Sequence, residues 1–198
     1  MTQKTKIVDK IKEDLAHYAS REHIQVNPAF VARMLLLTPG FQFVFAWRIQ
    51  EALFRVPVVG RILRRIVWWF SCLLFGSEIA LAANVDGGLY IPHPYGIVVG
   101  ASDIGKRVTL LQHITIGRKD HSDRGRPRIE DGASLMAGCV VLGSITIGSN
   151  SMIGANAVVL KDVPPNSIAV GAPAKILPRS DASPKSEDTL QGLAPEAA

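Results

Sequence analysis

The chain has 198 residues, of which 47% are hydrophobic and 20% are charged, so wholesale disorder is excluded. The formal charge is +5, which suits anionic ligands but is too evenly spread to indicate a nucleic acid partner. The two cysteines, Cys72 and Cys139, form no CxxC pair. This argues against a zinc site and a disulfide framework, and it favours a reducing, cytoplasmic setting.

Residues 1–80 form a region with the pattern of helices. Apolar residues recur every three or four positions between Ile7 and Tyr18, which predicts a first helix. Helix breakers follow at 27–28 and 38–40, and two apolar-rich helices are predicted over 41–55 and 59–75.

The most apolar stretch of this region, 66–76, is too short to cross a bilayer, which takes about 20 residues. It predicts a buried helix that packs on a neighbour. A second interpretation stays open, because three arginines adjoin two tryptophans here and such a helix can rest on a membrane surface. In that case residues 61–76 would make a peripheral contact at the inner face of the membrane. The residues concerned are Arg61, Arg64, Arg65, Trp68 and Trp69.

From Val85 onward the sequence repeats with a period of six. A helix would need a period near 3.6 and a flat strand a period near 2, so this period predicts a parallel β-helix over 81–177. Three hexads make one coil, twelve hexads make four coils, and residues 166–177 add a partial coil. The aliphatic residues expected to fill the interior are Val85, Ile91, Ile97, Ile104, Leu110, Ile116, Ile129, Leu135, Val141, Ile147, Ile153 and Val159.

Two segments depart from the repeat. Thirteen residues separate Ile116 from Ile129 where six are expected, so a loop over 117–128 leaves one corner of the β-helix. Long loops on a regular scaffold often carry function. Residues 178–198 are rich in Ser, Pro, Ala and charged residues, and we expect them to form a tail without fixed structure.

The third hexad position forms a column on one face of the predicted β-helix. It holds His93, then Gln112, Ala137 and Ala155 in successive coils. The side chains of this column become smaller from coil to coil. This pattern fits a reactive histidine at one end of a flat surface on which a narrow, extended ligand could lie.

Five segments are similar to one known family: 90–100, 108–117, 126–129, 153–164 and 170–175. They resemble the hexapeptide acyltransferases of the serine acetyltransferase type, a group that includes O-acetyltransferases of capsule and exopolysaccharide synthesis. The resemblance covers about 40–177. It implies a left-handed parallel β-helix with a helical N-terminal region, a homotrimer, and acetyl-CoA as acyl donor without a metal.

The resemblance also implies that His93 is the general base. A histidine that titrates near 6.5 can take the proton of an acceptor hydroxyl and return it to the leaving thiolate. No activated serine or cysteine is evident, so we expect direct transfer of the acetyl group. A backbone N–H near Gly117 would hold the developing oxyanion. His113, one coil above His93, is a second catalytic candidate.

The family places CoA in a groove between neighbouring subunits. Small residues along the column would form a flat wall for the pantetheine arm, and a turn near 171–175 would meet the adenine and phosphate end; both features also fit plain corners of a β-helix. The candidate cofactor-binding residues are Gly117, Ala137, Gly154, Ala155, Gly171, Ala172 and Lys175. The candidate substrate-binding residues are Gln112, His121 and Arg126.

Two departures from the serine acetyltransferase pattern bear on the acceptor. The family has an Asp immediately before the catalytic His, and this chain has Pro92 there. The family also has adjacent Arg and His residues in its loop, and this chain has Gly125 and Arg126 at those positions. We therefore expect a sugar hydroxyl of a surface polysaccharide as acceptor. The alternative is serine O-acetylation in cysteine biosynthesis.

Two further classes stay open beside an acetyltransferase. One is a β-helix that has lost catalysis and serves as a scaffold. The other is a metal-binding protein of the carbonic anhydrase type, which would need His93, His113 and His121 to converge on one ion.

Overall fold

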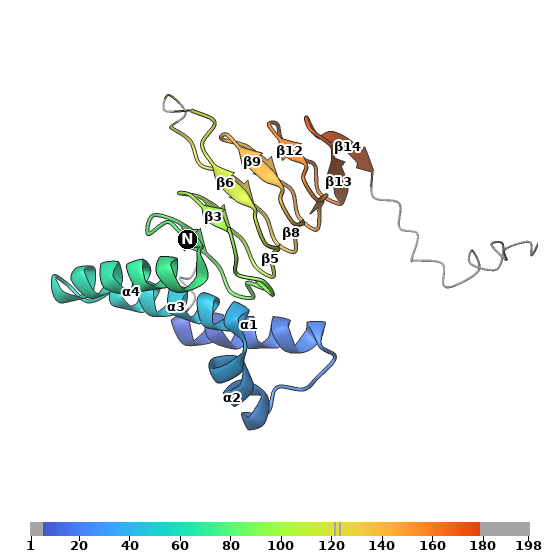
Figure 1. Ribbon diagram of the computed structural model, residues 1–198. Coiled ribbons are helices and arrows are strands. Elements are labelled where there is room, and N and C mark those ends of the chain that lie inside the picture. Colours follow the sequence, from blue (N-terminus) through green and yellow to red (C-terminus); the bar gives the residue numbers. More distant parts are fainter. Residues whose placement is uncertain (1–5, 121, 123, 179–198) are drawn as a thin grey trace, which may run out of the picture.

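The computed structural model describes residues 6–120, 122 and 124–178, so nearly all of the predicted tail lies outside the described residues. Figure 1 shows helices gathered at one end of a stack of β-coils. The helices of the described part are α1 (Ile7–Arg21), α2 (Pro28–Leu37), α3 (Pro39–Leu53) and α4 (Val59–Phe75). The predicted helix over 59–75 matches the bounds of α4.

Three sheets form the sides of the β-helix. Side 1 contains β1 (Glu78–Ile79), β3 (Val98–Val99), β6 (Thr115–Gly117), β9 (Val140–Leu142) and β12 (Val158–Val159). Side 2 contains β2 (Asn84–Val85), β4 (Asp103–Ile104), β7 (Arg128–Ile129) and β10 (Thr146–Ile147). Side 3 contains β5 (Thr109–Leu110), β8 (Ser134–Leu135), β11 (Met152–Ile153), β13 (Ser167–Val170) and β14 (Lys175–Pro178).

The interior of the β-helix is an aliphatic column, as the repeat predicts. All twelve predicted interior residues are at most 3% exposed. The ladder places Val85, Ile104 and Ile129 on one another in successive coils. Each coil therefore buries its apolar side chains against the coil above and the coil below.

The structure corrects the coil assignment at Ile97. Ile97 is buried, but the residue that pairs with Ile116 in the ladder is Val99. The preceding corner contains two prolines and a glycine with positive φ, and its extra length shifts the ladder by two residues. Ile79 pairs with Val99, so the β-helix begins before the first predicted hexad at Val85.

The last predicted coil is also different from the expectation. Within 166–177, β13 extends side 3 in parallel, whereas β14 folds back and pairs with β13 in antiparallel register. The chain therefore closes this end of the β-helix with a hairpin and not with a further coil.

Buried charges of the helices satisfy the backbone of the first coil. Arg48 is fully buried and donates to both carboxylate oxygens of Asp14, over 2.8 and 3.0 Å. The same guanidinium donates to the carbonyls of Val85 (2.9 Å) and Asp86 (2.6 Å). Asp14 in turn accepts from the N–H of Leu89. Burying a backbone N–H or carbonyl without a hydrogen bond costs free energy. Because this network pairs those groups of the first coil, the helices can cover the end of the β-helix.

Two helical residues fix the segment that leads into His93. The Tyr18 hydroxyl donates to the carbonyl of Ile91 (2.8 Å) and accepts from its N–H (3.1 Å). Gly40 lies so close to the same carbonyl that a Cβ at position 40 would be 1.9 Å from the Ile91 oxygen. The helical end of the molecule therefore sets the backbone position of the residues just before His93.

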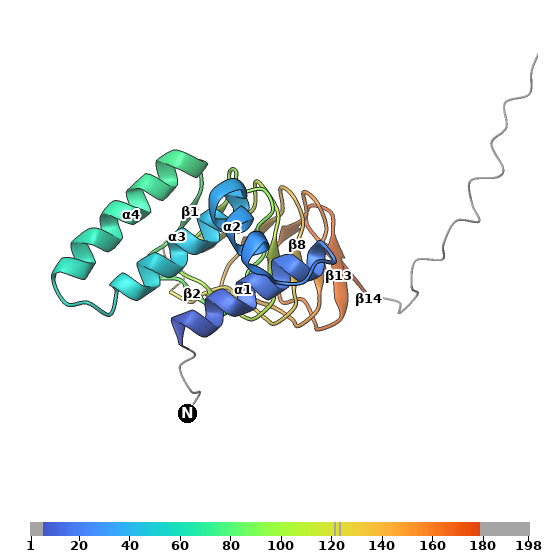
Figure 2. The same ribbon diagram turned by 90° about the horizontal axis from the view of Figure 1, so that it is seen from below.

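The prediction that 66–76 is a buried helix is wrong for most of its surface. In Figure 2, α4 lies at the outer edge of the molecule; α3 and the start of the β-helix contact one side of it, and its other side is open. The buried residues of α4 are Gly60, Ser71 and Phe75. The large apolar residues of the open side are exposed, because α4 turns its most apolar side away from α3.

Candidate active site

The column predicted from His93 lies on the corner between sides 3 and 1. Backbone hydrogen bonds join successive coils at this corner, for instance from the N–H of His113 to the carbonyl of Tyr95 (2.9 Å). Two coils further, the N–H of Asn156 donates to the carbonyl of Ala137 (2.9 Å). Because each coil rises about 4.8 Å, the column spans roughly 14 Å from the first coil to the fourth. The ladder brings Gln112, Ala137 and Ala155 into register, and the first-coil residue beneath Gln112 is Tyr95. His93 lies at the same corner but two residues earlier, because this corner is two residues longer than the repeat predicts.

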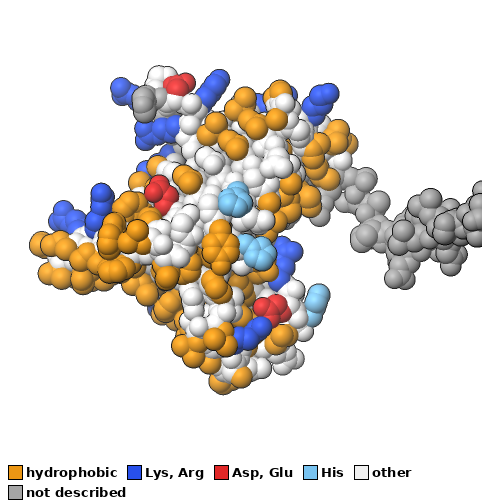
Figure 3. Space-filling view, in the orientation of Figure 1, with side chains coloured by type: hydrophobic (Ala, Val, Ile, Leu, Met, Phe, Trp, Pro, Cys, Tyr) orange, Lys and Arg blue, Asp and Glu red, His pale blue; other side chains and the backbone are white. Residues whose placement is uncertain are grey.

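Both candidate catalytic histidines are exposed at the lower end of this corner. A tight turn follows His93, in which the N–H of Tyr95 donates to the His93 carbonyl (2.9 Å). His113 has a positive φ of 58°, an uncommon conformation for a residue with a side chain. Figure 3 shows histidine side chains exposed near the middle of one face of the molecule.

Gly96 is a site residue that the sequence analysis missed. It has a φ of 66°, and a Cβ at this position would be 2.2 Å from Nδ1 of His113. The missing side chain is therefore what lets the His113 ring pack over the turn that carries His93. The only sequence signal was a glycine three residues after a candidate base, which any β-helix corner would also explain.

Gln112 has an unused acceptor beside the two histidines. Its Oε1 atom is buried, and no hydrogen bond reaches it from the residues that the structure describes. Unpaired buried acceptors are uncommon in native proteins. The described residues thus supply no donor for this buried atom.

The upper end of the column holds the predicted residues for the far part of CoA. The carbonyl of Gly171 accepts from the N–H of Val158 (3.0 Å), which places the β13–β14 turn above Ala155. A Cβ at Gly154 would be 2.7 Å from the Val170 side chain, so close packing accounts for this glycine. Gly171, Ala172 and Lys175 are exposed on the hairpin.

The long loop leaves a different corner, between sides 1 and 2. Gly117 ends β6 at the start of this loop. Arg126, near its end, donates to the carbonyl of Ala82 (3.0 Å) and lies 3.8 Å from the carboxylate of Asp103. Within one chain the structure therefore does not bring Arg126 to His93. His121 lies outside the described residues.

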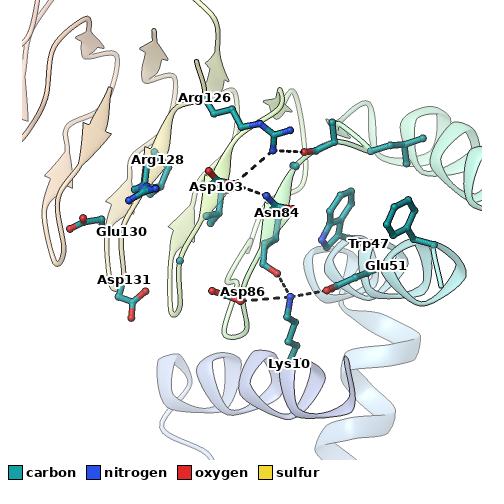
Figure 4. A pocket seen from close by; sticks show the side chains of 18 of the residues that line it. Lys10, Trp47, Glu51, Asn84, Asp86, Asp103, Arg126, Arg128, Glu130 and Asp131 are labelled. Atoms are coloured by element: carbon teal, nitrogen blue, oxygen red, sulfur yellow. Dashed lines mark hydrogen bonds and ion pairs between the residues drawn. The ribbon is translucent and has the colours of Figure 1, made fainter. Parts of the chain in front are cut away.

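A groove of about 1020 Å³ runs along side 2, away from His93 (Figure 4). Its lining holds five basic and five acidic residues, and some of them pair with one another. Lys10 points from α1 toward Glu51 (2.7 Å) and Asp86 (3.7 Å), and Arg126 points toward Asp103. The lining thus has no excess of one charge directed at a ligand.

Neither cysteine is suited to form an acyl-enzyme. Burial raises the pKa of the Cys139 thiol to about 12. Burial, and to a smaller extent Glu78, raises the pKa of Cys72. Because the thiolate is the nucleophile, both thiols are inert near neutral pH. In the part of the chain that the structure describes, no three metal-ligating side chains form a group.

Comparison with known proteins identifies the family. The family described as "Bacterial transferase hexapeptide (six repeats)" matches residues 126–161. The serine acetyltransferase of Synechococcus elongatus is 37% identical over 151 residues, 74% of this chain and 60% of that protein. The serine acetyltransferase of Bacillus pumilus is 36% identical over 161 residues, 80% of this chain and 70% of that protein. The chain thus spans 60–70% of the length of these two relatives.

A solved serine acetyltransferase in complex with CoA has the same fold. It superposes with a TM-score of 0.75 and 31% sequence identity, covering 86% of this chain and 69% of that one. These likenesses confirm the predicted family and the left-handed parallel β-helix with a helical N-terminal region. The chain belongs to the serine acetyltransferase family of hexapeptide-repeat acyltransferases.

Proposed function

We propose that the protein transfers the acetyl group of acetyl-CoA to the hydroxyl of L-serine, with His93 as general base. The observation that carries this proposal is the exposed His93 at the foot of a small-residue column, in a chain whose relatives are serine acetyltransferases. The sugar acceptor favoured by the sequence analysis has less support, because none of these relatives is named for it.

The reaction needs one group that moves a proton in both directions. His93 takes the proton of the serine hydroxyl while the hydroxyl oxygen attacks the thioester carbonyl carbon. The tetrahedral intermediate then loses CoA as its C–S bond breaks, and His93 returns the proton to the thiolate sulfur. The products are O-acetylserine and CoA. The raised pKa values of both thiols support a direct transfer without an acyl-cysteine.

Acetyl-CoA lies along the corner in this proposal. Ala137 and Ala155 leave room for the pantetheine arm, and the free Oε1 of Gln112 accepts one of its amide N–H groups. Gly171 and Lys175, exposed on the β13–β14 hairpin, meet the adenine and phosphate end. Gly117 lies at the loop's corner and would make the oxyanion contact from a neighbouring copy of the chain.

A sugar hydroxyl is the second candidate acceptor. Pro92 supplies no carboxylate next to His93, and Arg126 is bound to the carbonyl of Ala82 and faces Asp103. Both positions differ from those that hold the amino acid in the family that the sequence resembles. These differences leave fewer groups to bind the charged ends of serine.

We also propose a homotrimer, in which the loop of one copy faces the His93 corner of the next. Its support is the position of the loop on a different corner from His93 in the single chain. Light scattering after size exclusion checks the trimer: a mass of three chains agrees with it, and a monomer that is fully active contradicts it.

The test of function is release of the CoA thiol from acetyl-CoA with L-serine and with a panel of free and nucleotide-linked sugars. We expect serine-dependent turnover, a loss of about a hundredfold or more in His93→Ala, and no loss in the surface control His23→Asn. His113→Ala tests the second histidine in the same assay. Turnover only with a sugar selects the second candidate. Failure to bind CoA supports a scaffold, and CoA binding without turnover places the acceptor outside the panel. Equal turnover in His93→Ala removes His93 from the mechanism.

A further inference from the structure

The open side of α4 is a continuous apolar stripe. At 3.6 residues per turn its members fall within an arc of about 140°. An amphipathic helix normally turns such a stripe toward the core. The stripe consists of Val59, Ile62, Leu63, Ile66, Trp69, Phe70, Leu73 and Leu74, which are 44–75% exposed.

The side of α4 that faces the protein is the more polar one. Ser71 is buried there, and its Oγ has no hydrogen bond from the described residues. Trp68 Nε1 is buried in the same way, and the Arg64 guanidinium donates to the carbonyl of Leu81. Figure 2 shows α4 at the outer edge of the molecule, with none of the described chain beyond it. The apolar stripe is thus uncovered, whereas the polar side is packed.

The charge around the stripe has a single sign. Between residues 52 and 77 there are four arginines and no acidic residue: Arg55, Arg61, Arg64 and Arg65. Arg61 and Arg65 are exposed, and the Arg65 guanidinium lies 5.1 Å from the centre of the Trp68 ring. In Figure 3, blue side chains lie along the edge of the orange surface at the end of the molecule where α4 lies.

We propose that α4 docks on an anionic lipid bilayer, with its apolar stripe among the acyl chains and its arginines at the headgroups. An anionic bilayer matches both properties of this surface, since it accepts apolar side chains and attracts arginine. A second copy of the chain would match the apolar stripe but would bring the exposed Arg61 and Arg65 of one copy toward those of the other. The inference concerns where the enzyme works and does not depend on its acceptor.

The length of α4 fits a helix that lies on the membrane. Its 17 residues extend about 26 Å, and no helix of the described residues is by itself long and apolar enough to cross a bilayer. The pair α2 and α3, bent by 88°, reaches the required length and composition only when both are taken together. The geometry of α4 therefore fits a helix that lies parallel to the membrane surface, with its apolar stripe facing the acyl chains.

The test is cosedimentation of the full-length protein with vesicles of phosphatidylcholine, with and without phosphatidylglycerol. We expect binding to the anionic vesicles that weakens as salt is added, because exposed charges are screened. The double variant Arg65→Glu/Phe70→Asp should lose about tenfold or more of this binding. The matched control Val8→Asp/Lys12→Glu changes the same kinds of residue on the exposed surface of α1 and should bind as the wild type does.

A second readout locates the contact. Trp69 is 52% exposed, so anionic vesicles should shift its emission to shorter wavelength, and Trp69→Phe should remove the shift. Equal sedimentation with neutral and anionic vesicles, or no sedimentation at all, overturns the proposal. If the double variant instead halves the particle mass in light scattering without vesicles, the stripe is an interface between copies. Thiol release from acetyl-CoA, measured on the same variants without vesicles, separates this result from a failure of the proposed reaction.

Discussion

Different interactions stabilise the two ends of the molecule: apolar burial in the coils, and buried charged hydrogen bonds in the helical cap. In the coils, the interior consists of aliphatic residues in a fixed repeat, and each coil finds its hydrogen bonds on the next. At the helical cap, the first coil has β1 below it on side 1 but no complete coil. Its carbonyls are satisfied by charged side chains, among them Lys10 and Arg48, which both donate to Val85.

The difference shows at which positions a substitution destabilises a repeat protein most. A residue of the middle coils contributes apolar volume that another apolar residue of similar size can supply. A residue of the cap contributes specific charges at the one place where the repeat ends. The candidate site lies at the boundary, since His93 is in the first coil and His113 is in the second.

Replacement of Asp14 by Asn should have the largest effect on stability. Asp14 is 1% exposed and holds the buried Arg48, so the variant keeps the shape but leaves a buried cation with less compensation. We expect the free energy of unfolding to fall by about 3–5 kcal/mol. Urea unfolding at a fixed protein concentration measures it. The exposed pair of Arg33 and Glu22 is the control, and Glu22→Gln should cost less than about 1 kcal/mol; equal losses in the two variants contradict the assignment.

This contrast also explains how much the sequence could predict. The twelve interior residues were predictable because a period of six has no competing structure, and all twelve are buried. The column of Gln112, Ala137 and Ala155 followed from the same arithmetic, but the longer first corner puts Tyr95 and not His93 in register with it. The network of Asp14 and Arg48 joins residues 34 positions apart, with no periodicity to reveal it. The burial of α4 was misjudged because the spacing of apolar residues shows which side of a helix is apolar, but not whether that side faces the protein.

Two substitutions at Leu135 test the other half of the comparison. Leu135 is fully buried in the third coil. Leu135→Ala should cost about 2–5 kcal/mol because it leaves a cavity, whereas Leu135→Met should cost less than about 1.5 kcal/mol because the volume is kept. The same urea titration measures both. If Leu135→Met is as costly as Asp14→Asn, the coils are no more tolerant of shape-conserving changes than the cap, and the comparison fails.

Gly96→Ala tests the boundary where the site lies. Alanine at a φ of 66° should cost about 1–2 kcal/mol, and its Cβ would push the His113 ring away. We expect kcat/KM for acetyl transfer to fall about ten- to hundredfold. Gly76→Ala is the matched control, because Gly76 has a φ of 57° and a Cβ there meets no atom within 4 Å. If both variants lose the same activity, backbone strain and not the position of His113 is responsible.

The smallest expected effect is a pH dependence that comes from the cap. His17 lies against the first coil, where Nδ1 is 2.6 Å from the carbonyl of Gly88. Burial, and then the cations of Arg21 and Arg107, lower its pKa below the ordinary value of 6.5, although the hydrogen bond to Gly88 and the charge of Asp14 oppose this. As the pH falls below 6.5, the unfolded chain takes up a proton at this position before the folded chain does. The free energy of unfolding therefore decreases as the pH falls from 6.5 toward the lowered pKa, and the stabilising contribution is complete above 6.5.

The variant His17→Gln has no imidazole to protonate at this position. Its free energy of unfolding should therefore decrease less than that of the wild type as the pH falls below 6.5. Glutamine can still donate to the Gly88 carbonyl, which separates the loss of titration from the loss of the hydrogen bond. His23→Gln, at an exposed histidine, is the control for the exchange of a histidine for glutamine. A slope that is the same in all three proteins would mean that the cap adds no proton linkage and that its charges act only through the pairs around Arg48.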